Sequence, residues 1–178
     1  MDGRIILVFD FFGVISSEVF NLWLARHHLE DQYELAISIT RRADLGEINL
    51  EEEATLLGQI SGQGTEEILA EWYELMTINQ PIIDFMKANN RKYRFALLSN
   101  ASAEFVRPIL GQYELDEIFE QIFISSEMQL RKPHQDIFWT VAQSLNVTPE
   151  RCIMIDDKQP NIDAATSIGM RGILYKIP

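Results

Sequence analysis

The residues best suited to chemistry in this sequence are acidic side chains that follow short apolar segments. Asp10 directly follows the apolar run 5–9, and the pair Asp156-Asp157 follows the run 152–155. A carboxylate at the end of a buried strand is costly to bury unless a partner or a metal neutralises it. Asp10 is therefore the first candidate for chemistry, although a turn Asp before Gly13 explains this stretch alone equally well.

A hydroxyl group and an amine accompany these carboxylates. Ser99-Asn100 follows the apolar run 93–98, and Lys132 precedes Pro133 just before an expected helix. Parallel strands place their carboxyl ends at one edge of a sheet, where open α/β proteins bind ligands. The pattern predicts a crevice with three carboxylates, a hydroxyl and an amine. Taken singly, the acidic pair reads as a solvated turn and Lys132 as a surface lysine.

The elements that would position these groups alternate between helix and strand from residue 80 onward. Pro81 suits the first turn of a helix, and apolar periodicity favours helices over 102–112, 135–145 and 160–168. Short apolar runs favour strands over 5–9, 93–98, 121–124, 152–155 and 172–175, and Ser125-Ser126 follows the third of these. This alternation predicts the α/β class, with a doubly wound parallel sheet covered by helices on both faces.

Residues 16–79 interrupt the alternation directly after the first strand. Their apolar spacing predicts four helices with no strand among them. We therefore expect a core domain made of residues 1–15 and 80–178 and a small helical bundle made of residues 16–79. Asn49 with Glu52 is typical of a capping box at a helix start, and the acidic stretch 51–53 reads as a solvated first turn. The aromatic residues of the bundle are expected in its core: Phe20, Trp23, Trp72 and Tyr73.

Composition limits the kinds of partner. The net charge is −12, from 27 acidic and 15 basic residues, which argues against nucleic acid and against anionic membrane surfaces. A small phosphorylated ligand needs only local positive charge or a metal. Cys152 is the only cysteine, and no stretch reaches the length of a membrane span. Asp10 interrupts the first apolar run, so we reject a signal peptide and expect a cytoplasmic protein that is a monomer or a homodimer.

Four motifs, in this order, resemble those of the haloacid dehalogenase-like (HAD) superfamily over nearly the whole chain. They are Asp10-Phe11-Phe12-Gly13-Val14, Leu97-Leu98-Ser99-Asn100, Arg131-Lys132-Pro133 and Ile155-Asp156-Asp157. The helical block after the first motif is similar to the family's type-1 cap. Within the family, the pattern resembles small sugar-phosphate phosphatases and the N-terminal domains of epoxide hydrolases.

The resemblance implies a magnesium-dependent phosphatase that acts on a small phosphorylated metabolite. Asp10 would be the nucleophile that forms an aspartyl-phosphate. Mg²⁺ would be held by Asp10, the backbone carbonyl of Phe12 and Asp157, with Asp156 acting directly or through water. Such oxygen ligands suit Mg²⁺.

The resemblance also assigns the groups that would hold the phosphoryl oxygens. Ser99 and the amide of Asn100 would bind these oxygens, and Lys132 would neutralise the nucleophile and the transferring group. Such devices are general in phosphoryl transfer.

One residue departs from the family pattern. Phosphatases of this family usually carry a second Asp two residues after the nucleophile, where this chain has Phe12, and Phe12 cannot transfer a proton. Loss of a general acid/base typically costs about 10²–10⁴ in rate. We favour a phosphatase for leaving groups that need little protonation, such as acyl or anomeric phosphates. The alternatives are a catalytically silent binding protein and, with less support, a 2-haloacid dehalogenase, which carries an aromatic residue here but uses no metal.

Overall fold

A computed structural model describes residues 3–176 and contains one parallel sheet. Its five strands lie in the order β3-β2-β1-β4-β5, and every neighbouring pair is parallel. Phe9 of β1 is in register with Leu97 of β2 and with Ile155 of β4. The strands are β1 (Ile5–Phe9), β2 (Tyr93–Ser99), β3 (Gln121–Ile124), β4 (Cys152–Asp156) and β5 (Arg171–Leu174). This confirms the predicted doubly wound α/β sheet, with β5 displaced by one residue.

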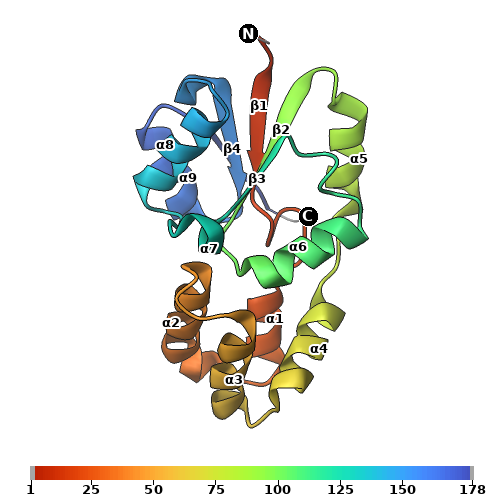
Figure 1. Cartoon of the computed structure of the whole chain (residues 1–178), viewed down its shortest axis with the longest axis vertical. Helices are drawn as coiled ribbons and strands as arrows, with labels where there is room; N and C mark the ends of the chain where they lie inside the picture. The colour runs from red at the N-terminus through yellow and green to blue at the C-terminus, as the bar shows by residue number, and fades with distance from the viewer. Residues whose placement is uncertain (1–2, 177–178) are drawn as a thin grey trace.

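Helices cover both faces of the sheet (Figure 1). Side chains alternate along β1, so that Leu7 and Phe9 belong to one buried cluster while Ile6 and Val8 belong to another. Helices α5 (Gln80–Asn89) and α6 (Ala103–Gln112) pack on the first face, and α8 (Gln135–Ser144) and α9 (Gln159–Ser167) pack on the second. Burial on both faces explains why the strands read as continuous apolar runs rather than as alternating ones.

Four α-helices follow β1, as the apolar spacing predicts. They are α1 (Val19–Arg26), α2 (Tyr33–Asp44), α3 (Leu50–Ser61) and α4 (Thr65–Leu75), with a 3₁₀ turn over Glu30–Gln32. We call these helices the α1–α4 group. The capping box at the start of α3 is confirmed, because the Asn49 side chain accepts from the Glu52 amide and the Glu52 carboxylate accepts from the Asn49 amide.

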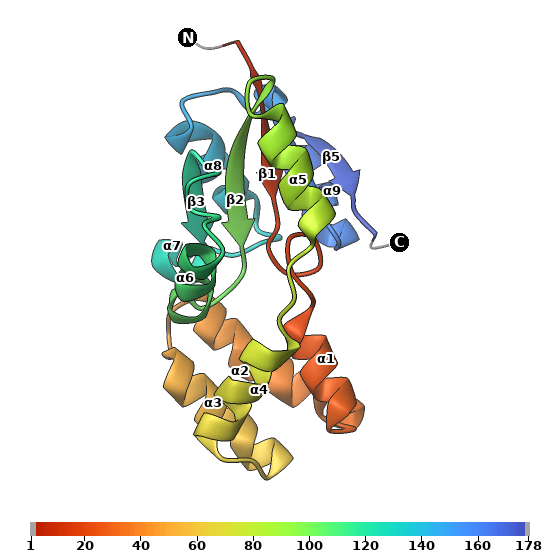
Figure 2. The ribbon, with the colours of Figure 1, turned by 90° about the vertical axis from the view of Figure 1, so that its right-hand side faces the viewer.

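The α1–α4 group lies beyond the carboxyl ends of the strands (Figures 1 and 2). The two segments that connect it to the sheet run together, since the Ser17 amide donates to the Thr77 carbonyl at 3.0 Å and the Asn79 amide donates to the Ile15 carbonyl at 2.8 Å. The group is therefore joined to the sheet by two hydrogen-bonded chain segments just beyond the carboxyl end of β1.

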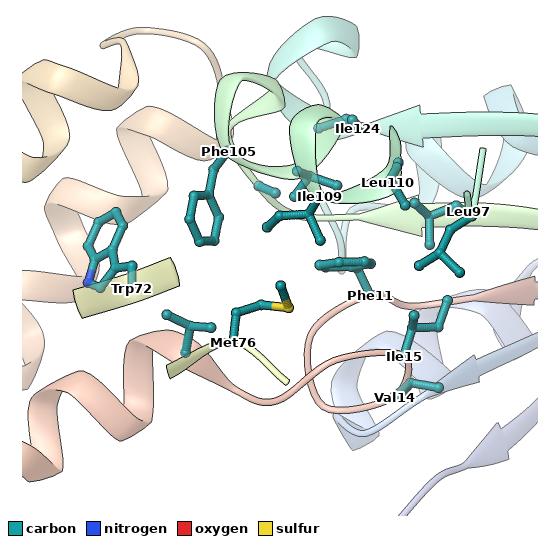
Figure 3. Packing of buried hydrophobic residues seen from close by; sticks show 14 of the residues in the cluster. Phe11, Val14, Ile15, Trp72, Met76, Leu97, Phe105, Ile109, Leu110 and Ile124 are labelled. Carbon is teal, nitrogen blue, oxygen red and sulfur yellow. The ribbon is translucent and has the colours of Figure 1, made fainter. Parts of the chain in front are cut away.

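Aromatic packing ties the α1–α4 group to the helix that follows β2. The ring of Phe105 in α6 lies 5.9 Å from that of Trp72 and 4.9 Å from that of Tyr73, centre to centre. Figure 3 shows Trp72, Met76 and Phe105 continuing the buried cluster that contains Phe11. Trp23 and Trp72 are buried as predicted, whereas Phe20 is half-buried and Tyr73 is 40% exposed.

Two short elements complete the fold: α7 (Ser125–Met128) and a 3₁₀ turn over Pro149–Arg151. Within residues 3–176, no helix is both long and apolar enough to cross a membrane.

Candidate active site

The loop after β1 places Asp10 at the end of the sheet and folds back immediately. The Asp10 amide donates to the Ile155 carbonyl at 2.9 Å, and the Phe11 carbonyl accepts from the amides of Ile15 and Ser16, both at 2.8 Å. Gly13 in this loop has φ of +78°. A Cβ atom on Gly13 would lie 2.6 Å from Oδ2 of Asp157. A glycine is thus required here both by the backbone and by the close approach of Asp157.

Lys132 joins the two carboxylates that the sequence places at opposite ends of the chain. Its Nζ lies 2.8 Å from Oδ1 of Asp10 and 2.7 Å from Oδ2 of Asp156, and its side chain is 1% exposed. The Asn100 side chain fixes the lysine backbone, donating to the Lys132 carbonyl at 2.9 Å and accepting from the Lys132 amide at 2.8 Å. The structure therefore brings together Asp10, Asn100, Lys132 and Asp156.

The charges of this cluster depend on one another. Burial raises the pKa of Asp10 well above its ordinary value, and the Asp156 charge adds to the rise while Lys132 opposes it. Burial lowers the pKa of Lys132, but the two carboxylates outweigh this effect and raise it overall. Although burial acts to raise the pKa of Asp156, the charge and hydrogen bond of Lys132 lower it overall. Lys132 is accordingly the cation that directly contacts both Asp10 and Asp156.

Asp156 has both carboxylate oxygens engaged. Oδ2 accepts from Lys132, and Oδ1 accepts from the Lys158 amide and from the Asn161 side chain, both at 2.9 Å. The other member of the pair is different, because Oδ1 of Asp157 is buried without a hydrogen-bond partner among the described residues. Asp156 thus positions Lys132, whereas Asp157 retains an oxygen able to bind a further group.

The three carboxylates are arranged as metal ligands could be. One oxygen each from Asp10, Asp156 and Asp157 lie within 4.8 Å of one another. The carbonyl of Phe12 accepts no hydrogen bond within the described chain. Three carboxylates this close together, one of them with an unpartnered oxygen, form a donor set that fits a hard divalent cation such as Mg²⁺.

The serines at the ends of β2 and β3 differ in their contacts. Ser99 is fully buried at the end of β2, and its hydroxyl has no hydrogen-bond partner in the part of the chain that is described. Ser125 and Ser126 instead hold the loop after β2, because their hydroxyls accept from the amides of Ala101 at 3.0 Å and Ala103 at 2.9 Å. These two serines act on the neighbouring loop rather than on Asp10.

A cavity of about 490 Å³ lies between the sheet and the α1–α4 group. Asp10, Phe12, Asn100 and Lys132 line it from the sheet side. The ring of Phe12 stacks on Phe105 with a centre-to-centre distance of 6.3 Å and an interplanar angle of 15°. Phe12, which stands where the phosphatases that this sequence resembles carry their acid/base Asp, is thus part of an aromatic wall of the cavity.

Sequence reasoning missed the charged residues that reach the cavity from other segments. The Asp44 carboxylate of α2 lies 3.4 Å from the guanidinium of Arg131, and Glu18 lies 3.2 Å from Nζ of Lys158. Glu53 of α3 lines the same cavity. The prediction of a solvated turn over 51–53 is wrong for Glu53, which is only 4% exposed. Nothing in the local sequence separates it from its exposed neighbours Glu51 and Glu52.

Comparison with known proteins identifies relatives of this arrangement. The chain is 33% identical over 85 residues to a phosphoglycolate phosphatase of Colwellia psychrerythraea, a match that covers 47% of this chain and 38% of the relative. It is 38% identical over 64 residues to a glyceraldehyde 3-phosphate phosphatase of Pyrococcus furiosus, covering 35% and 27%. The chain therefore spans less than half the length of these curated relatives.

Solved structures and a family model extend the likeness to nearly the whole chain. The fold matches that of a HAD family enzyme from Bacteroides thetaiotaomicron, solved in complex with magnesium and inorganic phosphate, with a TM-score of 0.79 and 22% identity over 97% of this chain and 93% of that one. The family model for haloacid dehalogenase-like hydrolases matches residues 6–169. The chain therefore belongs to the haloacid dehalogenase-like hydrolase family.

Proposed function

We propose that this protein is a magnesium-dependent phosphatase that acts on a small phosphorylated metabolite through an aspartyl-phosphate on Asp10. The observation that carries the proposal is the buried contact of Lys132 with both Asp10 and Asp156 at one end of a cavity. The phosphatase names of the two relatives and the phosphate and magnesium bound in the structural neighbour support it. In this proposal residues 16–79 form the cap domain, and residues 1–15 and 80–178 form the core domain.

Asp10 has one carboxylate oxygen available for attack. Oδ1 accepts from the Phe11 amide at 2.7 Å and contacts Lys132, while no described residue donates to Oδ2. In the proposed first step Oδ2 forms a bond to phosphorus, and the bond from phosphorus to the leaving oxygen breaks, with the electron pair leaving on that oxygen. Water then attacks phosphorus and the bond from phosphorus to Oδ2 breaks, with its electron pair returning to the Asp10 carboxylate. The water loses a proton to solvent, and inorganic phosphate is released. Lys132 opposes the rise in the pKa of Asp10 that burial causes, and so favours the carboxylate form that attacks.

A bound Mg²⁺ would be held by Asp10, the Phe12 carbonyl and Asp157, with Asp156 acting through water because its own oxygens are occupied. Such an ion neutralises the negative charge of the phosphoryl group and of the carboxylates around it. On the protein side, Ser99 and the Asn100 amide would bind phosphoryl oxygens. Asn100 would also keep Lys132 in place through its two hydrogen bonds.

Phe12 restricts the leaving group in this proposal. Its ring carries no exchangeable proton and stacks against Phe105, so it neither protonates a departing alkoxide nor activates water. The leaving oxygen must then take its proton from solvent, which is easy for a stable anion and slow for a simple alcohol. Acyl and anomeric phosphates are the substrate classes that fit this restriction.

Phe12 also favours a second candidate function. A HAD-fold protein without its acid/base could bind a phosphorylated ligand in the same cavity without turning it over. A 2-haloacid dehalogenase is a weaker third candidate, because the unpartnered Asp157 oxygen fits a metal-binding site that such enzymes do not use.

Release of inorganic phosphate from a panel of small phosphorylated metabolites, including acetyl phosphate and p-nitrophenyl phosphate, separates these candidates. A phosphatase releases phosphate only with Mg²⁺ present and loses this activity in Asp10→Asn. Ligand binding without release in any assay would establish the silent protein instead. Chloride release from 2-chloropropionate without metal would establish the dehalogenase.

A further inference from the structure

The part of the cavity wall formed by α2 and α3 contains a buried carboxyl group that has no counter-ion within residues 3–176. Four acidic residues line the cavity, and three of them contact a cation: Asp10 with Lys132, Glu18 with Lys158, and Asp44 with Arg131. Glu53 forms no ion pair with any described residue, although it is 4% exposed. A buried carboxyl of this kind is costly to ionise unless a ligand supplies the missing charge.

The surroundings of Glu53 intensify this cost. Burial raises the pKa of Glu53 to about 8, and the negative charge of Asp44 adds to the rise, while the Thr40 hydroxyl opposes it. Arg131 contacts Asp44 through one Nη at 3.4 Å, and its Nε is buried without a hydrogen-bond partner among the described residues. The charged residue that α6 places beside the start of α3 is also acidic. It is Glu104, whose carboxylate accepts from the Leu50 amide at 2.8 Å. No described cation forms an ion pair with Glu53, and its burial favours the protonated form.

The remaining wall of this part of the cavity mixes polar and apolar side chains. The α1–α4 group presents Asn21, Thr40 and Arg41 beside its acidic residues. Its apolar and aromatic side chains in the cavity are Val19, Phe20, Tyr33, Ile37, Leu50 and Trp72. Trp72 packs beside Phe105, another cavity residue (Figure 3). Aromatic faces attract organic cations, and a purely apolar ligand would leave Glu53 unpaired.

We propose that the part of the substrate remote from phosphate carries a protonated nitrogen that pairs with Glu53. The ligand class is thus a phosphorylated amine, with phosphate at Asp10 and the ammonium against α3. This inference rests on the proposed function, because it places phosphate at Asp10. The buried carboxyl and the ammonium form an ion pair on binding, and the proton that Glu53 carried in the empty cavity passes to the buffer.

The test uses non-hydrolysable ligands, so that it requires no turnover. Isothermal titration calorimetry with Mg²⁺ compares ω-aminoalkyl phosphonates with the ω-hydroxyalkyl phosphonates of equal length, over chains of two to five carbons. For at least one length, the wild-type protein is expected to bind the amine about tenfold or more tightly than the alcohol, since truncating one partner of a buried ion pair typically costs more than that. Equal affinities at every length would overturn the proposal.

Two variants assign the preference to Glu53. Glu53→Gln is expected to bring the amine and alcohol affinities within about twofold of each other, as loss of a charged hydrogen-bonding partner predicts. Glu51→Gln changes an exposed glutamate of the same helix turn and is expected to keep the wild-type preference. A preference that survives in Glu53→Gln would show that another group binds the ammonium.

Proton release gives a readout that does not depend on a folded variant. Titrations at pH 7 in buffers of different ionisation enthalpy are expected to show more protons released by the amine than by the matched alcohol in the wild-type protein. Identical proton release from the two ligands would contradict the pairing with Glu53.

If neither phosphonate nor inorganic phosphate binds and no phosphorylated metabolite is hydrolysed, the proposed function itself fails. If the alcohol binds and acetyl phosphate is hydrolysed without any amine preference, only this inference fails.

Discussion

At the scale of single residues, Phe12 determines which phosphate esters this site could cleave. Its ring belongs to the aromatic wall with Phe11 and Phe105, while its backbone carbonyl faces no donor among the described residues. The same residue can thus keep a metal ligand and lose a proton donor, because the two functions use different atoms.

Substitution Phe12→Asp tests this separation. The wild-type rate is expected to fall steeply as the pKa of the leaving group rises, and Phe12→Asp is expected to flatten that slope, with a gain of about 10²-fold for simple alcohol leaving groups. The measurement is kcat/KM over a series of aryl and alkyl phosphates. A wild-type rate that is independent of the leaving group would mean that another residue supplies the proton.

Glu53 gives a second residue-scale prediction, for stability against pH. The pKa of Glu53 is raised to about 8 in the folded protein and is about 4.3 in an unfolded chain. Between these values the unfolded chain has released the proton that the folded protein still holds, so stability falls as pH rises. The expected fall is about 1.4 kcal/mol per pH unit at most, fully developed above pH 8 and absent below pH 4.

Urea denaturation at pH 5, 7 and 9, without metal, measures this effect. The free energy of unfolding of the wild-type protein should decline relative to that of Glu53→Gln across this range. Parallel curves for the two proteins would show that Glu53 stays ionised when folded. Asp44, whose pKa burial raises to about 6, is present in both proteins and its contribution largely cancels.

At the scale of elements, the loop between β1 and α1 sets the distance from Asp10 to Asp157. Gly13 is the contact point, with positive φ and space for no side chain beside Asp157. Gly62 at the end of α3 has nearly the same φ, +79°, but nothing lies within 4 Å of a Cβ placed there. An alanine at either position would be forced into the same left-handed backbone conformation. Only at Gly13 would its methyl group also collide with a neighbouring side chain.

Gly13→Ala and Gly62→Ala therefore form a matched pair. Both are expected to lose about 1 kcal/mol of stability from the left-handed backbone. Only Gly13→Ala should also weaken Mg²⁺ binding, by about tenfold or more, because its methyl group would displace the Asp157 carboxylate. Thermal denaturation and calorimetric Mg²⁺ titration measure the two effects. Equal Mg²⁺ affinity in both variants would exclude Asp157 as a ligand.

The elements themselves were accessible from sequence because each depends on local chemistry. The apolar run ending at Asp10 predicts β1, and the Asn49-Glu52 pair predicts the start of α3. The sequence pattern does not predict helix α7, where the hydroxyls of Ser125 and Ser126 form hydrogen bonds with another loop. The predicted helical block also reaches residue 79, whereas α4 ends at Leu75, because the chain there turns back to pair with the segment before α1.

At the scale of the whole molecule, the cavity forms between two parts of the chain, and its walls could be predicted only in part. Asp10, Lys132 and Asp156-Asp157 were found because parallel strands share one edge. Glu53 was not found, because its burial depends on how α3 packs against α2 and α6, and nothing in its local sequence records this. The residues on the sheet side of the site can thus be predicted from the sequence, whereas those that the α1–α4 group contributes cannot.

In the proposed mechanism, Asp10 attacks phosphorus. Intact-mass spectrometry of the protein, quenched in acid during turnover of acetyl phosphate with Mg²⁺, tests it directly. Because Phe12 cannot activate water against the phosphorylated carboxylate, this species should accumulate. The expected spectrum shows a mass increase of one phosphoryl group in the wild-type protein, and none in Asp10→Asn. Phosphate release that proceeds while only the unmodified protein is observed would contradict the account.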